Sequence, residues 1–386
     1  QAGIQSIAST KRAFTALKED GFITSWVRAD YGGKLNFSFD EVSGKIQRIF
    51  STHSAFAAID RSGRVFTWGD QDGGGDSTEV AQDLSKNIQT VASTRSAFAA
   101  LNSDGKVVAW GNPNHGGDIS DVRKLNKGTV SHIFANKKAF AALKTDGSVV
   151  AWGDANNGGD TSGVGKQLKD SVRQIYATNG AFTALKSDGS LVTWGNPEHG
   201  GRISNQQRKK LDAPIVKIVA TNSAFAALLS DGSVVAWGDQ YGGGDPSDVA
   251  KKLKHDVVEI KATGSAFAAL KRDGSVVSWG NQDAGGDSSE VRQQLKKGVL
   301  DIVGSGAAFA ALKNDGSVVT WGDPEKGGEP DIRSERLESD VVSLTTPFDP
   351  TNLSETAQVF TDIERIGNTA LTQDSRGYYY AETPTT

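Results

Sequence analysis

The chain has 386 residues, of which 37% are hydrophobic and 23% charged, a composition typical of a soluble globular protein. It contains no cysteine, which excludes disulfides, thiolate metal sites and cysteine nucleophiles. The net charge of −4 lies in residues 343–386, so the rest of the chain is electrically balanced and matches DNA or RNA poorly. No run approaches the roughly 18 apolar residues of a membrane-spanning helix.

The dominant feature of residues 1–346 is an internal repeat of 42 residues. Each copy contains one phenylalanine and, twelve residues later, one tryptophan. The register is strict apart from a single step of 43, which indicates core packing rather than stacking on a sugar or a base. The phenylalanines are Phe14, Phe56, Phe98, Phe140, Phe182, Phe225, Phe267 and Phe309, and the tryptophans are Trp26, Trp68, Trp110, Trp152, Trp194, Trp237, Trp279 and Trp321.

One copy, residues 130–164, shows how the units are built. Residues 130–136 alternate between apolar and polar, as expected of a half-buried strand. A second strand is predicted at 139–143, where small side chains surround one large one. An Asp-Gly pair at 146–147 predicts a tight hairpin turn, because glycine tolerates positive φ. A third strand follows at 149–152, and then a polar loop that ends in Gly-Gly-Asp.

A short helix is predicted after the double glycine of most copies. In residues 287–298, Asp287 or Ser288 can cap the N-terminus of this helix. Val291 and Leu295 lie four residues apart, so they would share one face. Each unit is therefore expected to contain three strands and a short helix.

The repeat predicts an all-β, closed β-propeller. A lone three-stranded sheet of this size cannot bury enough surface, whereas eight sheets packed radially can. We expect eight mostly three-stranded blades over residues 1–346, with a short helix between blades. The first strand occurs a ninth time, at Leu344, where it either competes for ring closure or begins the tail. A seven-blade ring with one copy outside it is the alternative.

The repeated pattern is Ala-Phe-x-Ala-Leu-x-x-Asp-Gly-x-Val-x-x-Trp-Gly. It resembles the repeats of the RCC1-like propellers (regulator of chromosome condensation), and it does so in eight copies over residues 1–346. The three-stranded blade is similar to bacterial secreted members, which include an inhibitor of β-lactamase. The resemblance implies a protein-binding ring. Because members of this family act as exchange factors, ubiquitin-ligase modules, inhibitors and surface proteins, the fold alone does not select a function.

Residues 347–386 form an acidic tail, in which the repeat pattern is broken by Phe-Asp-Pro at 348–350. A strand, a turn and a strand are predicted over residues 368–380. Tyr378, Tyr379 and Tyr380 lie next to that turn, where they would dock onto a partner or the propeller, or pack as a hairpin edge. The chain begins at Gln1, so we expect it to be a trimmed or excised piece of a longer polypeptide.

The polar loop after each tryptophan is the predicted binding surface. These loops would repeat on one rim of the ring, and the differences between them would supply specificity. The candidate rim residues are Tyr31, Asp72, Asn114, His115, Asn156, Glu198, His199, Tyr241, Asp283 and Glu325. Oxygen ligands on a Gly-rich loop also suit calcium, for which Asp70, Asp72 and Asp76 are the best set. Capping of the turn and of the following helix is the competing interpretation.

The sequence contains no Walker loop, HExxH motif or nucleophile elbow, and we expect no enzymatic activity. The leading hypothesis is a protein-interaction or assembly module of an exported or cell-surface protein, with a protein partner or self-assembly. Under this hypothesis the protein needs no cofactor, and we expect neither nucleic-acid binding nor membrane insertion. The alternative is a calcium-dependent or lectin-like adhesin that binds a glycan. A guanine-nucleotide exchange factor or chromatin-binding regulator comes third, because the neutral body lacks a basic arm.

Overall fold

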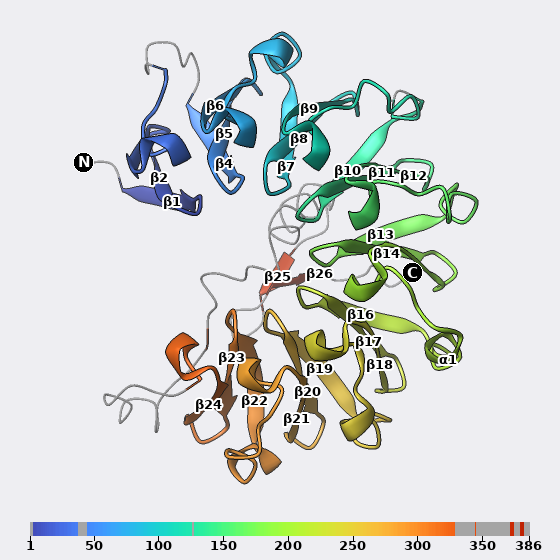
Figure 1. The fold of residues 1–386 in the computed structure, drawn as a ribbon. Coiled ribbons are helices and arrows are strands. Elements are labelled where there is room, and N and C mark those ends of the chain that lie inside the picture. Colours follow the sequence, from blue (N-terminus) through green and yellow to red (C-terminus); the bar gives the residue numbers. More distant parts are fainter. Residues whose placement is uncertain are drawn as a thin grey trace. The chain divides into compact units, whose positions relative to one another are not determined.

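The computed structural model describes residues 3–37, 45–125, 127–328 and 344, together with the backbone of 371–373 and 379–381. The repeat folds into eight three-stranded antiparallel sheets, which follow one another in chain order along an arc (Figure 1). The strands are β1 (Ile4–Ser9), β2 (Ala13–Lys18), β3 (Ile23–Val27); β4 (Ile46–Ser51), β5 (Ala55–Asp60), β6 (Val65–Gly69); β7 (Ile88–Ser93), β8 (Ala97–Asn102), β9 (Val107–Gly111); β10 (Val130–Ala135), β11 (Ala139–Lys144), β12 (Val149–Gly153); β13 (Val172–Ala177), β14 (Ala181–Lys186), β15 (Leu191–Gly195); β16 (Ile215–Ala220), β17 (Ala224–Leu229), β18 (Val234–Gly238); β19 (Val257–Ala262), β20 (Ala266–Lys271), β21 (Val276–Gly280); and β22 (Val299–Gly304), β23 (Ala308–Lys313), β24 (Val318–Gly322).

Each sheet carries its phenylalanine and tryptophan as a cross-strand pair. In the fourth sheet Phe140 lies opposite Trp152, and the two rings stack with their centroids 5.2 Å apart. Stacked pairs at 5.2–5.7 Å recur in all eight sheets. Seven of the eight phenylalanines are no more than 1% exposed, so the predicted core-packing role is confirmed for these seven.

Alternation along the second strand explains how neighbouring sheets pack. Successive side chains of a strand point to opposite faces, so Ala139, Ala141 and Leu143 share one face of β11. That face packs against Phe182 and Trp194 of the next sheet in one buried cluster. Equivalent clusters join every consecutive pair of sheets. All eight copies therefore form one continuous row, which argues against a seven-blade ring with one copy outside it.

The interface between sheets also requires glycine. Gly158 has a φ of +101°, a conformation that favours glycine. A Cβ at this position would lie 2.7 Å from Cδ2 of Phe182 in the next sheet. The Gly158 carbonyl accepts a hydrogen bond of 2.9 Å from Nε1 of Trp194. The Gly-Gly motif thus holds each loop against the aromatic pair of the following sheet.

This interface is missing between the last sheet and the first. Phe14 and Trp26 are 43% and 40% exposed, although their counterparts in the other sheets are buried. A Cβ at Gly327, the equivalent of Gly158 in the eighth sheet, would have no atom within 4 Å. In the part of the chain that the structure describes, the expected closed ring is therefore not formed by the contact that joins the other sheets. The ninth first strand, apart from Leu344, lies outside the described residues.

The prediction of a short helix between blades is wrong for most copies. Among the described residues the one α-helix is α1 (Asn205–Arg208), which begins with a capping box formed by Ser204 and Gln207. The segment predicted as a helix at 287–298 has turns and one 3-10 turn instead. A helix this short is marginal by itself, and buried anchors such as Leu295 fix the segment in another conformation.

The remaining short elements are single turns. The 3-10 turns are η1 (Ala29–Tyr31), η4 (Thr78–Val80), η5 (Pro113–His115), η6 (Ala155–Asn157), η7 (Pro197–His199), η9 (Ser247–Val249), η10 (Gln282–Ala284), η11 (Gln294–Lys296) and η12 (Pro324–Lys326), and the π-type turns are η3 (Gln71–Gly75) and η8 (Gln240–Gly244). Most of them lie in the polar loops that follow the tryptophans. None of the helices among the described residues has the length and apolar character to span a bilayer.

The chain divides into two units, Gln1–Thr351 and Asn352–Thr386. In the second unit β25 (Leu371–Gln373) pairs antiparallel with β26 (Tyr379–Ala381). Tyr379 and Tyr380 therefore belong to a strand that faces Gln373 and Thr372. Tyr378 lies outside the described residues, and docking of the three tyrosines stays a prediction.

Candidate functional site

The loops and turns at one end of the sheets form the candidate site, which we call the loop rim. It has an outer row of loops at residues 28–34, 70–76, 112–118, 154–160, 196–202, 239–245, 281–287 and 323–328, and an inner row of turns at residues 10–12, 52–54, 94–96, 136–138, 178–180, 221–223, 263–265 and 305–307. The rows are bonded within each sheet: Thr52 Oγ1, for example, donates to the Gly73 carbonyl at 2.8 Å. The predicted rim residues thus lie at one common end.

Two polar side chains hold most of the described outer loops in shape. The residue two positions after the tryptophan caps the 3-10 turn, as when Asn112 accepts from the Asn114 amide at 3.0 Å. The residue eight positions after the tryptophan caps the next turn, as when Asp118 accepts from the Ser120 amide at 2.8 Å. These carboxylates and amides are already committed to the backbone, which favours the capping interpretation.

Two of the three calcium candidates also accept hydrogen bonds within the rim, Asp70 from a serine side chain and Asp76 as a cap. Asp70 accepts from the Ser54 hydroxyl at 2.9 Å, and Asp76 accepts from the Thr78 amide at 2.9 Å. Only Asp72 of this set is a free loop tip. Across the described residues no three His, Cys, Asp or Glu side chains gather closely enough to hold a metal ion. The structure therefore offers calcium no assembled ligand set at this loop.

The residue four positions after each tryptophan is the tip of its loop, where the seven side chains from the second sheet onward are exposed. Tyr241 is the most prominent of them, with 77% of its surface exposed. The tip residues are Asp72, Asn114, Asn156, Glu198, Tyr241, Asp283 and Glu325. Their loops share one backbone frame but differ in charge and size, and such variation on a rigid frame can give a surface its specificity.

The three other predicted rim residues are only partly exposed. Tyr31 lies beneath the Arg12 guanidinium, which is 5.3 Å from the ring centroid. The His115 and His199 carbonyls accept hydrogen bonds from the threonines of their own inner turns. Burial, together with the nearby charges of Lys138 and Arg95, lowers the pKa of His115. These aromatic residues thus support the loops in addition to bordering the surface.

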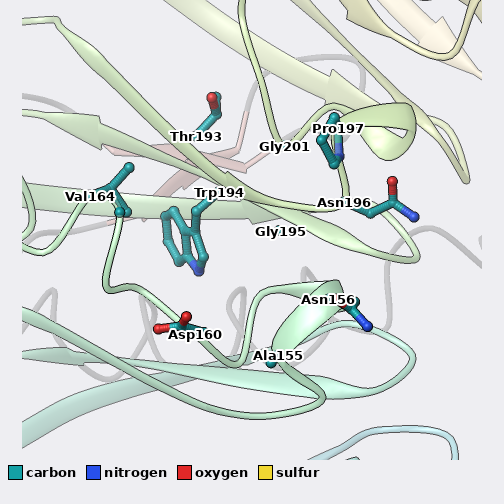
Figure 2. A pocket seen from close by; sticks show the side chains of 11 residues that line it. Ala155, Asn156, Asp160, Val164, Thr193, Trp194, Gly195, Asn196, Pro197 and Gly201 are labelled. Atoms are coloured by element: carbon teal, nitrogen blue, oxygen red, sulfur yellow. The ribbon is translucent and has the colours of Figure 1, made fainter.

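A pocket of 540 Å³ opens between the fourth and fifth sheets, next to the outer loops. Figure 2 shows Trp194, Asp160 and Thr193 around it, with Asn156 and Asn196 at its edge. Gly163 also lines it, and a Cβ there would meet nothing within 4 Å. At the corresponding position the second, third, sixth and seventh copies carry acidic side chains, namely Glu79, Asp121, Asp248 and Glu290. These four side chains are exposed, as is Gly163 itself.

Sequence reasoning missed the inner turns. The residue three positions before each phenylalanine forms the tip of an inner turn, and in the first four sheets it is Lys11, His53, Arg95 and Lys137. The signal was present in the repeat register, since these residues fall at one position in four consecutive copies. The signal is weakened because the fifth to eighth copies carry asparagine or glycine at this position.

The sequence matches no family model and no curated protein. The eight three-stranded antiparallel sheets with their repeat motif fit an RCC1-like repeat propeller. Among solved structures, Prp20p from Saccharomyces cerevisiae, studied with its binding to Gsp1p and histones, is 20% identical, with 64% of this chain and 74% of that chain covered and a TM-score of 0.37. The CRINKLY WD40 ectodomain of the Arabidopsis thaliana receptor kinase ACR4 is 15% identical, covering 73% and 98%, with a TM-score of 0.35. Human WBSCR16 is 14% identical, covering 81% and 87%, with a TM-score of 0.35.

Proposed function

We propose that the sheet array is a non-enzymatic protein-interaction module that binds its partner through the loop rim. The observation that carries this proposal is the set of seven outer loops, which repeat one turn with a positive-φ glycine and present different exposed tips. Tyr241 is an exposed aromatic side chain of the kind that anchors protein interfaces. Because the backbone frame is fixed by glycines and caps, binding would cost little ordering of these loops.

The test compares two matched sets of substitutions in affinity capture of partners from extracts of the source organism. The rim variant replaces Glu198, Tyr241 and Asp283 with asparagine, the residue that two other loops already carry at their tips. We expect this variant to lose the captured protein while its thermal unfolding midpoint stays unchanged.

The control variant changes the opposite end of the sheets. Val216, Val258 and Leu300 are 65%, 43% and 61% exposed at a repeat position where the second and third copies carry Gln47 and Gln89. Replacing the three with glutamine should leave capture intact. Loss of the partner in this variant, with retention in the rim variant, would place binding at the other end and overturn the proposal.

We also propose that the row of sheets closes into a propeller in solution. Phe14 and Trp26 are the aromatic pair of the first sheet, and the equivalent pair is buried by the preceding sheet in the seven other copies. Gly327 lacks a Cβ at the position where the other loops contact the phenylalanine ring of the next sheet. If the eighth loop covers the first sheet, Gly327→Ala should cost as much stability as Gly158→Ala. An effect as small as that of Gly189→Ala, whose Cβ would also have no neighbour within 4 Å, would show that the ring stays open.

Glycan binding is the second candidate function, and the pocket next to Trp194 favours it. The pocket offers the Asn156 and Asn196 amides and the Asp160 carboxylate to a sugar. Trp194 is only 4% exposed and is stacked on Phe182, so polar contacts rather than an aromatic face would hold the ligand. Gly163→Glu would place at the border of the pocket the kind of acidic side chain that four other copies carry there. Glycan-array binding that disappears in this variant would support the candidate, and an array without any signal would remove it.

We place the module outside the cell or on its surface. The support is the complete absence of cysteine and methionine, which leaves no side-chain sulfur to oxidise. Detection of the protein only in the cytosol, by fractionation with a tagged chain, would refute this location.

A further inference from the structure

Four consecutive inner turns bring basic side chains side by side. The backbone amide of Lys11 donates to the His53 carbonyl at 3.0 Å, the amide of His53 to the Arg95 carbonyl at 2.9 Å, and the amide of Arg95 to the Lys137 carbonyl at 2.9 Å. These bonds connect the first four sheets at the inner side of the loop rim. We call Lys11, His53, Arg95 and Lys137 the basic arc.

The arc carries more positive charge than it can balance locally. Arg12 and Lys138 are its sequence neighbours and add two more cationic groups. Within the described residues none of these six side chains forms an ion pair. Asp30 and Asp154 interact electrostatically with Arg12 and Lys138, but they are already hydrogen-bonded to Arg28 and Asn157. Like charges held together without counter-ions repel one another, and an anionic ligand would relieve that repulsion.

The protonation of the arc reflects this crowding. Burial lowers the pKa of His53, and the charges of Arg95 and Lys11 lower it further. Burial and the charge of Arg95 lower the pKa of Lys137. Both shifts have the sign expected from burial and from neighbouring cations. His53 is therefore mainly uncharged near pH 7, and the lysines and arginines supply the positive charge of the arc.

The other half of the inner row shows that the fold does not need these charges. The fifth to eighth turns carry Asn179, Asn222, Gly264 and Gly306 at the same position. The same backbone bonds continue there, with Asn179 donating to Asn222 at 2.9 Å and Asn222 to Gly264 at 2.9 Å. Neutral residues therefore satisfy the turn geometry, so the basic side chains are not explained by folding.

We propose that the basic arc binds an acidic segment of a protein partner. This inference rests on the proposed protein-interaction function and names the chemistry of the partner. The arc covers four turns only, and beyond it the outer loops of the fifth, seventh and eighth sheets carry the acidic tips Glu198, Asp283 and Glu325. A long polyanion such as nucleic acid would meet these carboxylates, whereas a short carboxylate-bearing segment would fit within the arc. The neutral turns of the fifth to eighth sheets mark where the attraction ends.

The test measures binding of a fluorescein-labelled octaglutamate peptide to the full chain by fluorescence anisotropy. Octaglutamine is the uncharged control peptide. We expect Arg95→Glu to weaken octaglutamate binding about tenfold, since it removes one exposed attraction and adds one repulsion. Asn179→Lys extends the arc by one turn and should tighten binding. Salt of about 1 M, where the Debye length is about 3 Å, should abolish it.

Lys106→Glu is the matched control variant. Lys106 belongs to the same sheet as Arg95 but lies at the opposite end, directly after the Asp-Gly turn. Its substitution by glutamate changes the net charge by the same amount as Arg95→Glu. We expect this variant to bind octaglutamate as the unaltered chain does. Equal losses in Lys106→Glu and Arg95→Glu would show an effect of net charge only and would overturn the proposal.

Two other results would also overturn it. One is the absence of octaglutamate binding by the unaltered chain at low salt. The other is tighter binding of a single-stranded oligothymidylate of equal charge through Arg95, which would assign the arc to nucleic acid. If Arg95→Glu leaves partner capture intact while the rim variant at Glu198, Tyr241 and Asp283 loses it, the proposed function stands and only the basic arc is refuted.

Discussion

Gly158→Ala tests the interface that joins each sheet to the next. The φ of +101° at this position costs an alanine about 1–2 kcal/mol. The new Cβ would lie 2.7 Å from Cδ2 of Phe182, well inside the usual contact distance of about 3.5–4.0 Å. Phe182 is fully buried and stacked on Trp194, so it has little room to move. Overpacking of this kind costs about 1–3 kcal/mol.

A third contribution comes from the hydrogen bond. If the loop shifts to relieve the contact, the Trp194 indole loses its acceptor, the Gly158 carbonyl, at a cost of about 1–3 kcal/mol for a buried group. Alanine also restricts the unfolded chain, which returns about 0.4–1 kcal/mol. The net expectation is a loss of about 2–5 kcal/mol in the free energy of unfolding, measured by urea titration with tryptophan fluorescence.

Gly189→Ala is the control for the backbone strain. Gly189 has a φ of +83°, and a Cβ there would have no atom within 4 Å, so only the strain and the unfolded-chain effect apply. We expect this variant to lose about 1 kcal/mol. If Gly158→Ala loses no more stability than Gly189→Ala, the proposed contact between neighbouring sheets does not limit stability and the reasoning fails.

Three further predictions concern single hydrogen bonds. Trp194→Phe should lose about 1 kcal/mol more stability than Trp237→Phe, because the Trp237 indole is buried without an acceptor; urea titrations of both variants, compared with the unaltered chain, check this. Ser204→Ala should cost about 1 kcal/mol by removing a helix cap, seen as a lower thermal midpoint, and an unchanged midpoint would contradict the capping box. The Ser190 hydroxyl and amide lower the pKa of Asp188 from its ordinary value of 3.8. That stabilisation is present above this value and is lost as the pH falls through the lower folded pKa, so Ser190→Ala should flatten the decline of the thermal midpoint below about pH 4.

The parts of the fold that repeat in sequence could be predicted from it. Phe140 and Trp152 recur at fixed spacing, and alternation around Phe140 places small residues on one face of its strand. These two facts are enough to predict three strands, the turn at 146–147 and burial of the aromatic pair. They hold for the second to eighth copies, because each of these packs its aromatic pair against the preceding sheet.

The parts that depend on geometry between copies could not be predicted. Whether Gly327 contacts Phe14 depends on the angle by which each sheet is rotated relative to the next. The repeat length in the sequence does not determine this angle. The helix expected at 287–298 also failed, because periodicity at Val291 and Leu295 shows which side chains face the core but not the path of the backbone between them. Tertiary packing decided that path.

The demands of the repeat help to locate binding specificity. Gly158 and Asp154 of one outer loop, like their counterparts in the other copies, are fixed by contact with the next sheet or by capping. Two positions leave the side chain freer, namely the outer tip, as at Tyr241, and the inner turn tip, as at Arg95. Both side chains are exposed, so a substitution there changes the surface, while the bonds between neighbouring inner turns use only the backbone. A partner that contacts both rows would therefore meet varied, partly acidic tips on the outer loops. On the inner turns it would meet positive charge on the first four sheets and neutral residues on the last four, so the two ends of the row differ in charge.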